Sequence, residues 1–94
     1  MMKSILQDEK KCFVTGSKMG LHKHHIFGSF NRDKSEKYGL WVWLCWDRHI
    51  ADSPYRTPHN DASVDLMFKK MAQRKFEETH SREEFMQIFG RNYL

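Results

Sequence analysis

The chain is 94 residues long, 39% hydrophobic and 30% charged, with a formal net charge of +4. This length is that of one domain with a small core, and the composition is that of a soluble globular protein. No apolar run approaches the ~20 residues that cross a bilayer. The residues after Met1 and Met2 give no sign of a secretory signal, so we expect a cytoplasmic protein with no membrane partner. The charge is compatible with a polyanionic partner, although a solvated basic surface is the simpler explanation.

The first half of the chain predicts a strand followed by a long loop. Residues 1–11 are mostly polar and are expected to form a loose N-terminal arm or one helical turn. Residues 12–16 indicate an extended segment that enters a tight turn. Residues 21–27 are a candidate strand that ends at Gly28. Residues 28–39 place turn formers and five charges between two glycines, which is typical of a long loop.

The clearest strand signal is at residues 40–44, with the sequence LWVWL. Alternation puts Trp41 and Trp43 on one face and Val42 and Leu44 on the other. Since both faces are apolar, this strand is expected to be buried on both sides. Its tryptophans are also compatible with a base-stacking platform, but a core strand is the better explanation.

The second half of the chain is helical. Asp47 is a candidate cap for a short helix that carries His49 and ends before Pro54, and residues 53–62 indicate a loop. From Ser63 the apolar residues recur at helical spacing, which predicts a helix to about residue 79; they are Val64, Met67, Phe68 and Met71. Residues 81–84 form a capping box that begins a last helix, which ends before Gly90. The order predicts an α+β fold.

A histidine cluster stands at the end of the first predicted strand. His22, His24 and His25 fall within four residues, and His49 and His59 follow. An imidazole with an ordinary pKa of about 6.5 can deprotonate a water near neutral pH. Further imidazoles can hold a divalent ion that offsets the charge of a phosphate. This pattern therefore points to metal-assisted phosphodiester hydrolysis, with scattered structural histidines as the alternative.

Several short motifs in a fixed order resemble a known family. They are residues 21–28 (LHKHHIFG), Asn31-Arg32, residues 35–40 (SEKYGL), Leu44-Cys45 and His49. In this order they resemble the HNH (ββα-metal, His-Me finger) endonucleases, in particular the small phage and prophage members related to recombination-enhancement nucleases. Residues 75–79 and 89–94 are similar to the ending of that group. The resemblance therefore extends over roughly residues 12–94.

The resemblance implies a role for each site residue. His24, His49 and His59 would bind one divalent cation, Mg²⁺ or Mn²⁺, and His25 would be the general base. Asn31 would pin the loop or orient His25, and a plain turn asparagine is the alternative. His59 is as compatible with a surface histidine as with a ligand. His22 is expected to be an exposed strand histidine.

The resemblance also implies a fold and its division along the chain. It predicts one domain over residues 1–94, with a treble-clef-like ββα-metal core of a hairpin and helix at residues 12–52. A long loop lies within the hairpin, and residues 63–94 form a two-helix tail.

Many relatives hold a structural zinc with two pairs of cysteines, and half of that site is missing here. Cys12 is followed by Thr15 and Cys45 by Arg48 at the positions of the second thiolates. Threonine does not replace a thiolate for zinc, and arginine is always cationic. We therefore expect that structural Zn²⁺ has been lost, with a makeshift site that recruits His22 as the alternative. With no secretory signal, both cysteines are expected to be reduced.

The partners implied by the resemblance are nucleic acid and protein. Lys23, Arg32 and Lys34 are expected to contact DNA as part of a basic rim, with a merely solvated loop as the alternative. The implied function is a metal-dependent DNA endonuclease encoded by a phage or prophage and acting in the bacterial cytoplasm. A recombinase filament is a possible recruiting partner. The alternative is a catalytically weakened HNH fold that binds DNA or protein, such as a phage inhibitor of a host defence enzyme.

Overall fold

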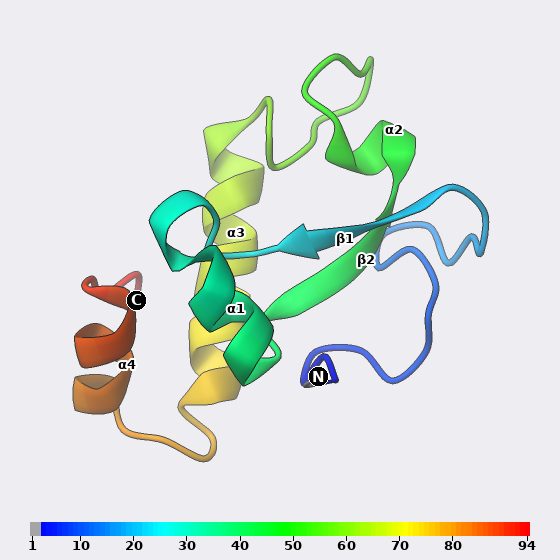
Figure 1. The fold of residues 1–94 in the computed structure, drawn as a ribbon. Helices are drawn as coiled ribbons and strands as arrows, with labels where there is room; N and C mark the ends of the chain where they lie inside the picture. Colours follow the sequence, from blue (N-terminus) through cyan, green and yellow to red (C-terminus); the bar gives the residue numbers. More distant parts are fainter. Residues whose placement is uncertain (1–2) are drawn as a thin grey trace.

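The computed structural model describes residues 3–94 as an α+β fold in which helices cover a two-stranded antiparallel hairpin. In chain order the elements are β1 (Leu21–His25), the 3₁₀ turn η1 (Ser29–Asn31), α1 (Arg32–Tyr38), β2 (Trp41–Cys45), α2 (Trp46–His49), α3 (Ala62–Phe76) and α4 (Arg82–Phe89) (Figure 1). The expected α+β class is confirmed, and the finer ββα-metal assignment stays a prediction. Within the described residues, no helix has both the length and the apolar character needed to cross a bilayer.

The two faces of the hairpin differ in chemistry. β1 pairs with β2 in a register that places His24 opposite Val42 and His25 opposite Trp41. Side chains alternate along a strand, and residues directly opposite share a face. The histidine face consists of His22, His24, Val42 and Leu44, and the tryptophan face of Lys23, His25, Trp41 and Trp43. The alternation expected for β2 is confirmed, although Trp43 is only half-buried.

β1 is shorter than expected, because the chain leaves the strand after His25 instead of continuing to residue 27. Ile26 and Phe27 turn into the core and are almost fully buried. Phe27 is then anchored by Ser35, whose hydroxyl accepts from the Phe27 N–H at 2.9 Å and donates to the Phe27 carbonyl at 2.8 Å. The strand therefore ends at the residue expected to be the general base.

The prediction of a loop at residues 28–39 is wrong. This segment contains η1 and a two-turn helix, α1. Gly39 follows the last residue of α1 and has a left-handed backbone, with a φ of 71°. The turn formers at residues 28–31 suggested a loop throughout, but residues 32–38 contain no helix breaker. The buried Ser35, which holds Phe27, fixes α1 against β1.

The N-terminal arm is not loose, in contrast to the expectation for residues 1–11. Met1 and Met2 lie outside the described residues. From Ser4 onward the segment is hydrogen-bonded beside β2: Ile5 N–H donates to the Gly39 carbonyl, and the Trp43 N–H donates to Gln7 Oε1, both at 2.9 Å. Residues 12–16 form a turn rather than an extended segment, because the Gly16 N–H donates to the Cys12 carbonyl.

The later helices confirm the predicted order, with shifted boundaries. α2 begins directly after β2, so Asp47 lies in its first turn and makes no capping hydrogen bond. α3 is capped by Asp61, whose side chain accepts from two N–H groups, and it ends three residues before Thr79. The capping box at the start of α4 is confirmed, and Gly90 follows the helix with a φ of 79°.

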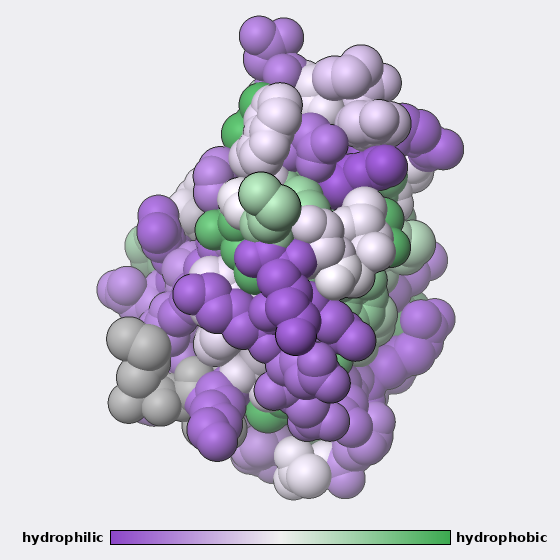
Figure 2. Space-filling model, turned by 90° about the vertical axis from the view of Figure 1, so that its right-hand side faces the viewer, coloured by the Kyte–Doolittle hydropathy of each residue, from purple (hydrophilic) through white to green (hydrophobic). Residues whose placement is uncertain are grey.

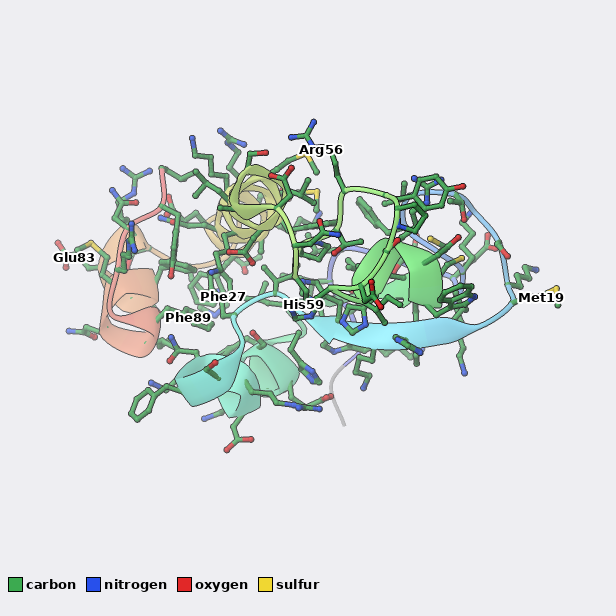
Figure 3. All side chains as sticks on the ribbon, turned by 90° about the horizontal axis from the view of Figure 1, so that it is seen from above. Met19, Phe27, Arg56, His59, Glu83 and Phe89 are labelled. Atoms are coloured by element: carbon green, nitrogen blue, oxygen red, sulfur yellow. The ribbon has the colours of Figure 1, made fainter. Side chains whose placement is uncertain are left out.

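The core joins the histidine face to α3 and α4. α3 runs between the hairpin and α4 (Figures 1 and 3). Its buried residues Phe68 and Phe76 belong to the same cluster as Val42 of β2. Phe27 and Phe89 pack with ring centroids 4.6 Å apart and connect the end of β1 to α4 (Figure 3).

The surface at the right of Figure 1 is mostly hydrophilic. Figure 2 shows this face with hydrophobic side chains in small, separate patches. Scattered apolar side chains of this kind are normal on a protein surface.

Candidate active site

The three predicted ligands of the divalent cation meet on the histidine face. One ring nitrogen from each of His24, His49 and His59 lies within 4.8 Å of the others. The ring centroids are 5.1 Å apart for His24 and His49, 5.3 Å for His24 and His59, and 4.7 Å for His49 and His59. The expectation that these side chains converge is confirmed, and together they could hold one metal ion.

Three different local structures bring the ligands together. His24 lies on β1, and α2 follows β2 without a loop, which returns His49 to the same face of the hairpin. His59 lies in a turn above the end of β1 (Figure 3). Thr57 holds that turn: it is fully buried and donates from its hydroxyl to the Ile50 carbonyl at 3.0 Å.

The electrostatics favour neutral imidazoles. His24 is 3% exposed, and its Nε2 is buried without a hydrogen-bond partner among residues 3–94. Burial, followed by the proximity of His49, lowers the pKa of His24 to about 3. Burial and then His59 lower the pKa of His49 to about 4. Because metal ligands must be deprotonated, and a buried polar atom without a partner is costly, these residues fit a metal ion.

A fourth imidazole, His22, touches this group. Its Nδ1 lies 3.0 Å from Nδ1 of His49, and Nε2 of His49 lies 3.1 Å from Nε2 of His59. His22 is exposed, as expected, but it contacts the candidate ligand His49 as well as solvent. Residue alternation along β1 could have indicated this, since His22 and His24 share a face.

A hollow beside the end of β1 connects the ligands to the predicted base. It has a volume of about 190 Å³ and is lined by Lys23, His24, His25, Gly28, Ser29, Arg32, His49 and His59. His24 and His25 point to opposite faces of the strand, yet both reach this hollow because the strand ends at His25. A neighbouring hollow of about 320 Å³ also contains both residues and adds Asp65 and Lys69 of α3.

His25 has a carboxylate partner that the sequence analysis missed. Its Nε2 lies 2.8 Å from Oε1 of Glu36 on α1. The hydrogen bond from His25, followed by the proximity of Lys23, lowers the pKa of Glu36. The loop predicted at residues 28–39 assigns no direction to the Glu36 side chain. The helical sequence before Gly39 was the signal that could have placed it.

The Asn31 side chain makes no hydrogen bond with His25 among the described residues, and its assignment as a catalytic residue stays a prediction. Its side-chain amide donates to the Phe89 carbonyl at 3.3 Å, at the end of α4. The other expected task, pinning this segment, is the one observed. The reason is position: Asn31 immediately precedes α1 and faces α4.

The three predicted DNA-binding cations lie in different environments. Lys23 Nζ is 3.2 Å from Glu36 and lies over the Trp41 ring at 4.1 Å from its centroid. Lys34 Nζ donates to the Ile88 carbonyl at 2.7 Å. Arg32 is exposed at the hollow, and its guanidinium makes no hydrogen bond or ion pair with any described residue. Of the three, Arg32 is the cation whose charge no described residue offsets.

The two cysteines remain neighbours through Thr15. The Thr15 N–H donates to Cys12 Sγ at 3.4 Å, and the Thr15 hydroxyl lies 3.4 Å from Cys45 Sγ. Burial alone would raise the pKa of the Cys12 thiol, but hydrogen bonds from Thr15 and the Cys45 backbone bring it down to about 7.

Both thiols are buried and free. Within residues 3–94 they gather no third metal ligand. His22, considered as a makeshift partner, contacts His49 instead. Arg48 lies over the Tyr55 ring, 3.7 Å from its centroid.

The site thus combines three converging imidazoles, another imidazole with a carboxylate partner and an exposed guanidinium at one hollow. Such a set can hold a metal ion, accept a proton and attract a phosphate. Comparisons with protein-family models, with curated proteins and with solved structures found no match.

Proposed function

We propose that the chain is a metal-dependent endonuclease of the HNH class that hydrolyses DNA phosphodiester bonds. The observation that carries this proposal is the convergence of His24, His49 and His59 beside His25 at one hollow. A general base and a metal site must lie close to the same phosphate for this chemistry. The resemblance to HNH endonucleases supports the same assignment.

The ligand set also bears on the choice of ion. His24, His49 and His59 offer three nitrogen ligands and no carboxylate. Imidazole suits transition metals, whereas Mg²⁺ prefers oxygen ligands. We therefore expect Mn²⁺ or Zn²⁺ to bind more tightly than Mg²⁺. When bound, the ion would offset charge on the scissile phosphate and the leaving oxygen.

Residues of the chain would carry out the proton transfer and bind the phosphate. His25 would take a proton from a water, and the resulting hydroxide would attack phosphorus. The bond from phosphorus to the 3′-oxygen would break, and that oxygen would take a proton from solvent. The products are a 5′-phosphate and a 3′-hydroxyl, as the resemblance implies. Arg32 would pair with a phosphate oxygen at the rim of the hollow.

A second candidate is a catalytically weakened HNH fold that binds DNA or protein. The loss of half of the zinc ligands favours it, since Thr15 and Arg48 occupy thiolate positions of the resembling family. An inhibitor of a host defence enzyme would be one such accessory protein. The two candidates differ in whether the protein cuts DNA.

The test is plasmid nicking as a function of Mn²⁺ concentration. We expect His25→Ala to retain metal binding and to lose on the order of 10²–10⁴ in rate, the usual contribution of a general base. His49→Ala should lower metal affinity, so that excess Mn²⁺ restores part of the activity. His80→Ala is the control, because this imidazole stacks on Phe76 outside the site, and it should cut like the wild type.

If the wild type cuts no form of DNA with Mg²⁺, Mn²⁺ or Zn²⁺, the endonuclease proposal fails and the accessory protein replaces it. If His25→Ala cuts as fast as the wild type, the base assignment is wrong.

A further inference from the structure

Glu36 connects α1 to the end of β1 through two side chains. Its Oε1 lies 2.8 Å from His25 Nε2, and its two oxygens lie 3.2 and 3.3 Å from Lys23 Nζ. Lys23 and His25 are two residues apart and share the tryptophan face. The carboxylate therefore spans neighbouring positions on one face of the strand.

The carboxylate is presented by an anchored element. The preceding residue, Ser35, is fully buried, and its hydroxyl is hydrogen-bonded to both the N–H and the carbonyl of Phe27. Gly39 ends α1 and is hydrogen-bonded to the N-terminal segment through Ile5. Glu36 thus lies on a short helix that is held on both sides.

The direction of the hydrogen bond follows from the charge of the carboxylate. With Lys23 and His25 as partners, Glu36 is ionised at neutral pH, because its pKa lies below the ordinary value of 4.5. An ionised carboxylate accepts hydrogen bonds and cannot donate. The proton of this bond must therefore reside on His25 Nε2. In a neutral ring, Nδ1 is then without a proton.

We propose that Glu36 is the positioning residue of His25, which it holds in the Nε2–H tautomer with Nδ1 as the proton acceptor. The catalytic consequence rests on the proposed endonuclease function. A water gives its proton to Nδ1 and becomes the hydroxide that attacks phosphorus. The imidazolium formed in this step lies against the negative carboxylate of Glu36, which stabilises it. No oxidant, reductant or further reactant is required.

A merely structural role for Glu36 would be an ion pair with Lys23 that joins α1 to β1. That role needs the charge of the carboxylate but imposes no tautomer on His25. The protonation pattern of the His25 ring therefore separates the two roles, and it can be measured without DNA or metal.

The first experiment is ¹⁵N NMR of the histidine rings in metal-free protein at about pH 8.5, roughly two units above the ordinary imidazole pKa. We expect the wild type to show His25 in one neutral tautomer, with a hydrogen-bonded proton on Nε2. Glu36→Ala should give a mixture of tautomers and lose that proton signal. Glu36→Asp should retain part of it, because the charge remains on a shorter side chain.

Glu83→Gln is the matched control for removal of a carboxylate. Glu83 is exposed on α4, at the left end of the molecule in Figure 3, whereas His59 lies near the middle. The His25 signals should not change in this variant. Circular dichroism should show that all variants are folded, since the Glu36 side chain is 32% exposed and fills no core position.

The second experiment measures nicking at saturating Mn²⁺. Glu36→Gln should lower kcat on the order of 10²–10⁴-fold, the upper value being the effect of removing the charged partner of a histidine base. KM and metal affinity should change little, because Glu36 touches neither the phosphate nor the imidazole trio. Glu83→Gln should cut like the wild type.

The inference is overturned if wild-type His25 carries its proton on Nδ1, or if Glu36→Ala leaves its ring signals unchanged. It is also overturned if an active wild type retains full kcat in Glu36→Gln. A wild type that cuts no DNA contradicts the endonuclease proposal, while the tautomer result still decides whether Glu36 orients His25.

Discussion

At the scale of single residues, the main feature of the site is the low pKa of two of its histidines. His24 and His49 lie in contact with other imidazoles, and burial lowers the pKa of both. The Nε2 of His24 has no partner among the described residues. A site of this kind is compatible with a metal ion and poorly compatible with added protons, which has a measurable consequence for stability.

We expect metal-free protein to lose stability as the pH falls below about 6.5. Above this pH both histidines are neutral in the folded and unfolded chains. Below it the unfolded chain binds protons that the folded chain excludes until the pH reaches about 4 for His49 and about 3 for His24. At about 1.4 kcal/mol per pH unit, the buried His24 should account for about 2 kcal/mol between pH 6.5 and 5. The half-buried His49 should add less.

Urea unfolding at several pH values in the presence of a chelator measures this effect. The window from pH 6.5 to 5 lies above the ordinary pKa range of carboxyl groups. The double variant His24→Gln/His49→Gln should therefore lose most of the slope in this window. A slope that persists unchanged in the double variant would show that other groups cause it.

At the scale of elements, side chains of α1 contact both the candidate site and α4. Glu36 contacts His25, and Arg32 lies at the rim of the hollow. Lys34 reaches α4, where it donates to the Ile88 carbonyl. Cations near the C-terminal end of a helix satisfy its last carbonyls and interact favourably with its dipole. One short helix thus serves both the proposed chemistry and the packing of the tail.

Arg32→Ala and Lys34→Ala should therefore affect different properties of the protein. Arg32→Ala should weaken DNA binding on the order of tenfold at about 0.1 M salt and lower the salt dependence by about one ion, because one phosphate contact is lost. Lys34→Ala should leave DNA binding nearly unchanged and lower the free energy of unfolding by about 0.5–1 kcal/mol. Binding titrations at several salt concentrations and urea unfolding measure the two effects. Equal losses of DNA affinity would contradict the division.

At the scale of the whole molecule, an aromatic core packs the end of β1 against α3 and α4. Phe85 is fully buried, with ring centroids 5.5 Å from Phe27 and 5.6 Å from Phe76. Each aromatic side chain buries roughly 150–250 Å². Cys12 and Cys45 belong to the same buried cluster. Their thiols contribute to packing and to hydrogen bonds with Thr15.

We expect the cysteine pair to hold no zinc. Protein purified without chelator is suitable for metal analysis, with one complication: the imidazole trio can itself bind zinc. The comparison is therefore between the wild type and Cys12→Ala/Cys45→Ala, which should have the same zinc content. His24→Ala/His49→Ala should contain much less. A zinc content that falls by about one ion per chain in the cysteine variant would show a thiolate site after all.

The sequence alone determined the features that depend on local signals. β2 was predicted to within one residue, because alternation of large apolar side chains is a strand pattern at any position. The capping box of α4 was predicted because its hydrogen bonds join residues three apart. The convergence of His24, His49 and His59, which could hold a metal ion, was expected through the resemblance, whose motifs are also short and ordered along the chain.

Only the tertiary structure decided the partners of these residues. Glu36 is 11 positions from His25, Lys34 is 54 positions from Ile88, and His22 is 27 positions from His49. No local pattern encodes such contacts, because they depend on how β1, α1, α2 and α4 pack. α1 itself was missed for the same reason: a helix of 7 residues has little stability of its own. Its contacts with Phe27 hold it in place, and those contacts put Glu36 beside His25.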